Sequence, residues 1–289
     1  MWYHIGDWGK CLPFPQPDRG RHPVLPKKFL IFIPAYNCEH QVPRVLDQLL
    51  DPKVQAFAGE CIVVNNRSTD GTEEAVKSWM AAHPDAPVRL LRNDENYGLG
   101  GSHKVAFGYA IDHGYDYLVV LHGDDQGDVR DLCPLVESGE YQNYDCCLGS
   151  RFMRGSRIKG YSALRIFGNY GFNWLFSLVT LHKITDLGSG LNLYRVASLK
   201  NRYYLKFPDT LYFNDCMILA QCHYKQKMLF FPISWREEDQ VSNTKLTSFA
   251  MSLLRMCGQY LTGHKKFVEQ EMRTKIIDDY SYQVVASNL

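Results

Sequence analysis

Short apolar runs alternate with segments of helical periodicity in the first half of the chain. Four runs predict buried strands: FLIFIP at 29–34, CIVVN at 61–65, VRLLRN at 88–93 and DYLVVL at 116–121. Three segments between them predict helices: 41–50, 68–83 and 102–114. This alternation predicts an α/β fold with a mostly parallel sheet and helices on both faces.

The second half of the chain has a less regular pattern. Residues 161–181 form an aromatic, mostly apolar segment, and 185–195 predict a loop that enters a strand. A helix is predicted at 209–227 and a further strand at 228–235. An amphipathic helix is predicted from Leu246. A more charged helix should follow. We expect an irregular extension over 1–27, a main domain over 28–240 and a C-terminal part over 241–289.

Polar clusters follow three of the predicted strands. PAYN begins at Pro34, NNRSTD at Asn65 and HGDDQGD at His122. Ligands of such sheets bind beyond the carboxyl ends of the strands, so these clusters should share one edge. The segment NDENYGLGG at 93–101 should be a loop whose glycines allow close approach to a ligand. Together these features predict a nucleotide site.

Bulk composition narrows the class of protein. A formal net charge of +1 gives no reason to expect a nucleic-acid partner. No apolar run is long enough to span a bilayer, and the first ten residues lack the apolar core of a signal peptide. Nine cysteines occur without a C-x-x-C pair, which favours reduced thiols and a cytoplasmic location.

Seven elements in order resemble the family-2 glycosyltransferases, and within them the polyprenyl-phosphate, dolichol-phosphate-mannose-synthase-like group. The elements are IPAYN, VVNNRSTDGT, NYGLGG, HGDDQ, GSRF, GNYGFN and TDLGSGLNLYR, and they cover roughly residues 28 to 245. The resemblance implies the GT-A fold over 28–240 and an inverting hexosyltransferase. It also implies a nucleotide-sugar donor, a polyprenyl-phosphate acceptor and a Mg2+ or Mn2+ cofactor.

The resemblance implies a metal motif in HGDDQ. A divalent cation neutralises the departing diphosphate, and carboxylate oxygens are its preferred ligands. Aligned on Gln126, the second family carboxylate is Asp124, whereas the first is replaced by His122. The metal ligands that the resemblance implies are Asp124, Gln126 and His122, where His122 either ligates the metal or lies beside it. Asp125 occupies a spacer position, and Asp128 is interpreted as a helix cap.

The donor site that the resemblance implies draws on several loops. Its expected residues are Pro34, Ala35, Tyr36, Asn37, Glu39, Asn65, Asn66, Asp70, Gly100, Gly101, Lys104, Gly123, Asp124, Asp125, Gln126, Arg151 and Lys245. Asn65 and Asn66 stand where family members usually have acids, which weakens inference about the base. Tyr36 either stacks on the base or belongs to the core, and Asp70 either contacts ligand or caps the next helix. Lys245 belongs to a stretch that resembles a closing loop.

Arg151, Asp186 and Asp215 are the expected catalytic residues. Arg151 suits a phosphate clamp, with a plain salt bridge as the alternative. Asp186, Ser189 and Gly190 belong to a segment that lies near sugar and acceptor in the family. Asp215 is the expected base if the acceptor is a hydroxyl, but a phosphate acceptor is already an anionic nucleophile and needs no base. The REED run from Arg236 is interpreted as a solvated charge cluster.

Three functions are compatible with these residues: transfer to a polyprenyl phosphate, the same chemistry on a glycan or protein hydroxyl, and non-catalytic binding of a sugar nucleotide. A lipid acceptor would place the protein peripherally at the cytoplasmic face of a membrane. One helical face carries Phe249, Leu253, Met256, Tyr260 and Leu261, with Lys245, Arg255, Lys265 and Lys266 within or beside it. This face either enters a membrane interface or packs on the main domain.

Overall fold

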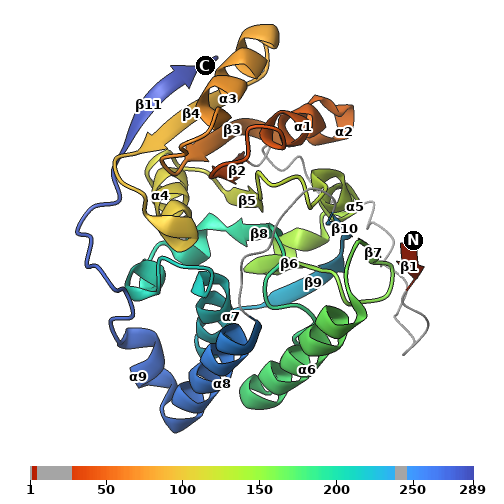
Figure 1. The fold of residues 1–289 in the computed structure, drawn as a ribbon, viewed down its shortest axis with the longest axis vertical. Helices are drawn as coiled ribbons and strands as arrows, with labels where there is room; N and C mark the ends of the chain where they lie inside the picture. The colour runs from red at the N-terminus through yellow and green to blue at the C-terminus, as the bar shows by residue number, and fades with distance from the viewer. Residues whose placement is uncertain (1, 5–27, 238–245) are drawn as a thin grey trace.

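The computed structural model describes residues 2–4, 28–237 and 246–289. A mixed eight-stranded sheet forms its centre (Figure 1). In sheet order its strands are β11 (Tyr282–Ser287), β4 (Val88–Asn93), β3 (Ala58–Asn65), β2 (Phe29–Ala35), β5 (Tyr117–Leu121), β8 (Leu191–Arg195), β6 (Cys146–Ser150) and β9 (Met228–Pro232). The strands β4, β3, β2 and β5 run parallel, whereas β8 is antiparallel to both of its neighbours. The α/β prediction is confirmed.

Helices cover both faces of the sheet. One face carries α1 (Val42–Asp47), α2 (Pro52–Gln55), α3 (Thr72–Ala82) and α5 (Cys133–Ser138). The other carries α4 (Gly98–Asp112), α6 (Ala163–Thr180), α7 (Phe213–His223), α8 (Leu246–Thr262) and α9 (His264–Glu269). Strand β2 serves both cores, because Leu30 and Phe32 point to one face while Ile31 and Ile33 point to the other.

A small second sheet and one edge strand were not expected from the sequence. Strands β1 (Trp2–His4), β7 (Arg157–Lys159) and β10 (Ser234–Arg236) form a three-stranded sheet in the order β1, β7, β10. Strand β11 returns from the C-terminal part to pair antiparallel with β4 (Figure 1). The segment predicted as a single strand at 228–235 is divided between β9 and β10, which belong to different sheets.

The glycine-rich segment after β4 is a loop only up to Tyr97, so its prediction as a loop is confirmed for 94–97 and wrong from Gly98, where a helix begins. Helix α4 starts at Gly98, and the Gly100 N–H donates to the Asp209 carbonyl at 2.9 Å. A Cβ on Gly100 would lie 2.4 Å from the Pro208 carbonyl oxygen, and one on Gly101 would lie 2.4 Å from the Tyr97 Cβ. The absence of side chains at Gly100 and Gly101 therefore makes room for neighbouring segments of the same chain.

Helix α8 packs on the domain through most of the face that was a candidate for membrane contact. Leu253, Met256 and Tyr260 are buried, and the partly buried Phe249 ring stacks on Tyr212 at 5.3 Å. Only Leu261 of that face is exposed. The packing alternative is therefore correct for this face, and the membrane alternative is wrong for it. Within the described ranges, no helix has the length and apolar character needed to cross a membrane.

Eight cysteines fall within the described residues, and all are buried free thiols. Burial raises the pKa of several of them, for example that of Cys38 to about 12. The prediction of reduced cysteines is confirmed for this part of the chain.

Candidate active site

The three polar clusters meet at one edge of the sheet. The Gly123 N–H donates to the Pro34 carbonyl at 3.1 Å, and the Asn66 N–H donates to the Ala35 carbonyl at 2.9 Å. The His122 N–H donates to the Gly190 carbonyl at 2.9 Å, which adds the loop before β8. The predicted common edge is therefore confirmed, with β2 at its middle.

Asn65 and Asn66 hold the loop after β3 in place. Asn66 accepts from the Tyr97 N–H at 2.8 Å and from Asn93 Nδ2 at 2.9 Å, and its own Nδ2 donates to Asn96 at 2.8 Å. Asn65 Nδ2 donates to Glu73 at 3.0 Å. The amides therefore use their ability to donate and accept within the protein.

A second set of bonds joins the loop after β2 to the loop after β3. Asn37 Oδ1 accepts from the Thr69 N–H at 2.8 Å, and Glu39 Oε2 accepts from the Gly71 N–H at 2.6 Å. Asp70 accepts from the Glu39 N–H at 3.2 Å and from the Thr72 N–H at 3.0 Å, so it also caps the start of α3. These contacts hold the loops after β2 and β3 in place at this edge of the sheet.

The aromatic ring of Tyr36 stands in the open at this edge. Its side chain is 51% exposed, so the interpretation as a core residue is wrong. Arg67, on the loop after β3, is also exposed and has a left-handed backbone (φ 63°). An exposed ring beside two fixed loops suits stacking on a planar base.

Asp124 and Asp125 are adjacent but differ in environment. The Asp124 carboxylate is partly exposed and accepts from the Gln126 N–H at 3.2 Å. Asp125 is buried between two arginines: Arg44 Nε donates to it at 2.6 Å, and Arg236 donates from the other side. Asp125 therefore anchors the turn, and Asp124 presents its carboxylate to the open edge.

Gln126 follows on the far side of the turn. Its carbonyl accepts from the Arg236 N–H at 3.0 Å. Together with Asp128, Arg157, Trp235 and Arg236, among others, it lines an open hollow of about 610 Å³. Asp128 caps the short helix Val129–Leu132 by accepting from the Arg130 N–H at 3.0 Å, as interpreted from the sequence.

His122 lies in the interior behind Asp124. Its Nδ1 is 4.0 Å from Asp124 Oδ2, and its ring lies 6.1 Å from that of His103, measured between centroids. Burial, together with the nearby Arg151 charge, lowers the pKa of His122 to about 4. The imidazole is therefore neutral at pH 7, and its buried Nε2 has no hydrogen-bond partner.

The described residues contain no cluster of three or more His, Cys, Asp or Glu placed to hold a metal ion. They do provide one accessible carboxylate, that of Asp124, and a neutral imidazole with an unpaired nitrogen. Mg2+ is often held by one or two carboxylates together with substrate phosphates rather than by the protein alone. The residues present therefore fit a cation that binds together with a diphosphate.

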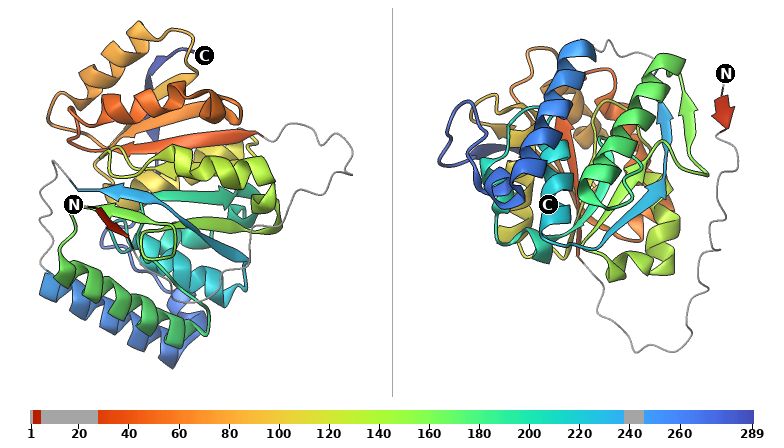
Figure 2. Two further views of the ribbon diagram at one scale, coloured as in Figure 1. Left: turned by 90° about the vertical axis from the view of Figure 1, so that its right-hand side faces the viewer. Right: turned by 90° about the horizontal axis from the view of Figure 1, so that it is seen from below.

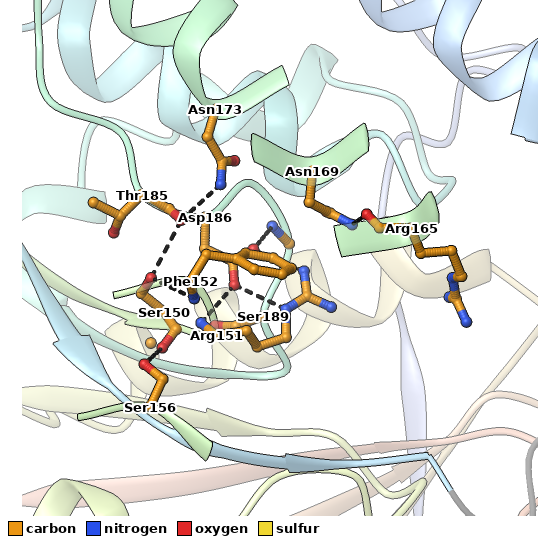
Figure 3. Close-up of polar contacts among 12 residues, drawn as sticks. Ser150, Arg151, Phe152, Ser156, Arg165, Asn169, Asn173, Thr185, Asp186 and Ser189 are labelled. Atoms are coloured by element: carbon orange, nitrogen blue, oxygen red, sulfur yellow. Dashed lines mark hydrogen bonds and ion pairs between the residues drawn. The ribbon is translucent and has the colours of Figure 1, made fainter. Parts of the chain in front are cut away.

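Arg151 and Asp186 form a buried ion pair on the other half of the edge (Figure 3). Arg151 Nε and Nη2 donate to the two Asp186 oxygens at 2.8 and 2.7 Å, and the Arg151 N–H donates at 2.8 Å. Arg151 Nη1 donates to the Tyr161 hydroxyl at 3.0 Å. The guanidinium is thus engaged on all three nitrogens, which favours the salt-bridge interpretation over a phosphate clamp.

Asp215 lies in the first turn of α7 and is buried near this pair. Burial raises the pKa of its carboxyl well above the ordinary value, and the negative charge of Asp186 adds to the shift. The shift favours the protonated form of the carboxyl over the ionised form. Ser189, from the same loop as Asp186, is also buried, and its hydroxyl donates to the Leu191 carbonyl at 3.2 Å.

Helix α6 closes this half of the edge with polar side chains (Figure 3). Asn173 Nδ2 donates to the Thr185 carbonyl at 2.7 Å, directly before Asp186. Arg165 Nη1 binds both Glu237 oxygens, at 2.5 and 2.6 Å. Arg236 and Glu237 are therefore engaged, and the interpretation of this run as solvated is wrong for these two residues. Glu238, Asp239 and Lys245 lie outside the described residues.

Lys104 is turned into the protein. Its Nζ donates to the Phe207 carbonyl at 2.6 Å, to Asp209 at 2.7 Å and to the Tyr280 hydroxyl at 3.0 Å. Burial lowers its pKa to about 8, although the charge of Asp209 opposes this. Lys104, Gly100 and Gly101 thus contact the 207–209 segment, and no open surface reaches the lysine.

Several residues of the site were missed from the sequence. Arg44 lies 81 positions from Asp125, on α1, and its sequence context carries no sign of that contact. His103 and Tyr161 likewise acquire their roles only through packing.

A mostly parallel sheet whose carboxyl edge carries an exposed ring, a partly exposed carboxylate and two fixed loops is the arrangement typical of nucleotide-binding α/β enzymes. Residues 30–202 match Glycosyl transferase family 2, and the chain belongs to this family. The chain is therefore a glycosyltransferase, of the hexosyltransferase type, and nucleotide-sugar donors are typical of the family.

Two curated proteins show the range of relatives. The undecaprenyl-phosphate mannosyltransferase of Micrococcus luteus is 26% identical over 173 residues, which cover 60% of this chain and 68% of the relative. The dolichyl-phosphate beta-glucosyltransferase of Dictyostelium discoideum is 24% identical over 278 residues, covering 88% and 81%.

Solved structures confirm the GT-A fold. A mannosyltransferase from Pyrobaculum calidifontis, in complex with GDP-Man and Mn2+, superposes with a TM-score of 0.54 at 16% identity. The superposition covers 87% of this chain and 76% of that one.

Proposed function

We propose that the chain transfers a hexose from a nucleotide sugar to a polyprenyl phosphate, with inversion and with a divalent cation. The phosphate oxygen attacks the anomeric carbon as the bond to the diphosphate breaks. The names of the relatives from Micrococcus luteus and Dictyostelium discoideum support a lipid-phosphate acceptor.

The burial of Asp215 is the observation that carries the choice of acceptor. A hydroxyl acceptor needs a base that is ionised at the working pH. Asp215, the expected base, is buried near Asp186, and burial raises the pKa of its carboxyl, which makes the ionised form harder to reach. A phosphate monoester supplies its own anionic oxygen and needs no such base. Asp215 then serves to position the loop before β8 rather than to take a proton.

On the donor side, Tyr36 stacks on the base and the fixed loops after β2 and β3 enclose the nucleoside. Asp124 holds the cation against the diphosphate, with His122 behind it. When bound, the cation supplies Lewis-acid stabilisation of the leaving diphosphate. Asp125 and its two arginines keep the turn in the shape that exposes Asp124.

Asp215→Asn tests the acceptor class. The amide keeps the size of the side chain and cannot act as a base. With a polyprenyl phosphate in detergent as acceptor, we expect transfer within about tenfold of the parent chain, because a role in positioning survives an isosteric change. Asp124→Asn in the same assay is the inactive control. A loss by Asp215→Asn of about a thousandfold, together with transfer to soluble glycan hydroxyls, would favour a hydroxyl acceptor with Asp215 as its base.

The same substitution has a pH-dependent effect on stability. In the unfolded chain Asp215 ionises at its ordinary pKa of about 4, whereas the folded chain retains the proton to a higher pH. The stability of the folded chain therefore falls as pH rises from about 4 towards the raised pKa. Asp215→Asn removes this term, so its unfolding free energy relative to the parent should increase from acid to neutral pH. Urea denaturation across that range measures the difference, and a constant difference would contradict a protonated Asp215.

A further inference from the structure

Helix α6 has an outer face that nothing in the described chain covers. Large apolar side chains follow one another at helical spacing along it: Leu164, Phe167, Trp174, Leu178 and, directly after the helix, Leu181. Phe167 is 76% exposed and Trp174 is 69% exposed. Soluble monomers rarely expose a continuous apolar stripe of this length, so it indicates a contact surface.

Helix α8 carries a second exposed apolar row. Met251 and Leu254 are exposed on the side away from the buried Leu253 and Met256, and Leu261, at the border of the two sides, is exposed as well. The two helices lie against each other on one side of the molecule, seen in green and blue (Figure 2). We call the outward rows of α6 and α8 together the apolar face.

Cations, and no acids, lie on and directly beside the outer rows of the two helices. The sequences of α6 and α8 contain no Asp or Glu. Lys183 after α6, Arg255 on α8, and Lys265 and Lys266 after it are exposed. The nearest acid in the sequence after α8, Glu269, lies 3.9 Å from Lys265, measured between Oε1 and Nζ. Exposed cations thus border the apolar face, although the chain as a whole has a net charge of only +1.

We infer that the apolar face docks onto an anionic lipid bilayer. An apolar stripe with Trp and Phe, bordered by Lys and Arg and free of acids, matches the two attractions that hold a helix at a lipid interface. A second protein would more often meet mixed charges at the border of its contact surface.

The docking adds to the proposed function a route by which a lipid acceptor reaches the site. Only this role in acceptor delivery rests on the proposed function. The opposite side of α6 carries Arg165 and Asn173, which contact Glu237 and the carbonyl before Asp186. An α-helix is about 10 Å across, so a docked α6 brings this half of the site to the headgroup layer. A lipid phosphate then reaches the site while its chain stays in the bilayer.

Vesicle flotation with the full chain tests the inference. The vesicles contain phosphatidylcholine alone or phosphatidylcholine with phosphatidylglycerol. The double variant Phe167→Ser/Trp174→Ser removes the centre of the stripe. Ile276→Ser is the matched control, because Ile276 is equally exposed but lies in the segment between α9 and β11. All three proteins should unfold at similar temperatures, since the changed side chains are exposed.

The parent and Ile276→Ser should float with the anionic vesicles, less so at high salt. The double variant should bind at least about a hundredfold more weakly, because two large apolar side chains no longer enter the interface. Equal flotation of all three proteins overturns the inference, as does absence of flotation at low salt. A dimer of the parent that the double variant fails to form, measured by light scattering, would assign the face to a second copy instead.

Transfer assays separate this inference from the proposed function. With a short, water-soluble polyprenyl phosphate, the parent and the double variant should act alike. With the same phosphate on a long chain in anionic vesicles, the double variant should be slower by about its loss in binding. Failure of the parent on both acceptors contradicts the proposed function, and flotation still decides the docking.

Discussion

Two loops on the same sheet edge treat their acidic residues differently. In the loop before β8, Asp186 is buried and receives bonds from Arg151 on both oxygens. In the turn after β5, Asp124 keeps a partly exposed carboxylate, while its neighbour Asp125 takes up the two arginines. The enclosed acid holds the structure together, and the partly exposed acid reaches the edge of the sheet where a ligand would bind. The comparison teaches that burial and partners, rather than residue type, assign the role.

Removing either partner of the buried Arg151–Asp186 ion pair should destabilise the folded chain strongly. Asp186→Ala leaves the Arg151 charge buried without its partner, and we expect a loss of about 3–5 kcal/mol in the free energy of unfolding. Arg151→Met should cost a similar amount. The double variant Arg151→Met/Asp186→Leu should recover much of the loss, because an apolar pair carries no unpaired charge. Urea denaturation of the three variants gives the coupling energy. Simple additivity would show that the pair does not act as a unit.

Substitution of Asp124 should show the opposite pattern, with a large effect on the transfer rate and a small effect on stability. Asp124→Asn should lower the transfer rate roughly a thousandfold, about 4 kcal/mol in the barrier, because the diphosphate loses a carboxylate-bound cation. The unfolding temperature should stay near that of the parent, because an amide oxygen can still accept from the Gln126 N–H. Initial rates with saturating Mg2+ or Mn2+ measure the effect. Near-normal activity would remove Asp124 from the metal site.

His122→Ala sharpens the same contrast. Its neutral ring lies behind Asp124, so we expect a smaller loss of about ten- to a hundredfold in rate. The Mn2+ concentration needed for half-maximal rate should rise less than in Asp124→Asn. Equal damage from the two substitutions would show that His122 is a full ligand.

The smallest effects come from two glycines of one helix. At Gly100 the surroundings are enclosed, and a Cβ would meet the Pro208 carbonyl, so Gly100→Ala should cost about 1–3 kcal/mol. At Gly108 nothing lies within 4 Å of an added Cβ, so Gly108→Ala should gain about 0.5–1 kcal/mol through helix propensity. Thermal unfolding compares them. A similar sign for both would show that α4 does not depend on close contact with the 207–209 segment.

The sequence predicts the central strands and their helices well, and it predicts the C-terminal elements poorly. Strands β2 to β5 and their helices follow from apolar runs and helical spacing. Strand β11 did not stand out, because Tyr282–Ser287 pairs with a strand nearly 190 positions earlier and its pattern is only partly alternating. Helix α8 has apolar residues on both sides, so periodicity alone does not tell which side is buried.

In the candidate site, too, features that depend on local sequence were predicted, and features that depend on contacts with distant segments were not. The common edge and the importance of Asp124 follow from strand ends and motif spacing, which are local. The fates of Asp125 and Lys104 depend on Arg44, Arg236, Asp209 and Tyr280, which come from distant segments. No local pattern reports such contacts. The raised pKa of Asp215 likewise depends on burial, which only the packed structure shows.

Strand β11 has a consequence for how the protein can be handled. It covers the edge of the sheet at β4, and Asn288 Nδ2 then bonds the Met80 and His83 carbonyls at the end of α3, at 3.1 and 3.0 Å. A chain cut before Tyr282 would present the unpaired N–H and C=O groups of β4 to any other strand in solution. Self-association of shortened forms, through this bare edge, would then be mistaken for a natural oligomer. Affinity tags are safer on a linker beyond Leu289 than in place of the final strand.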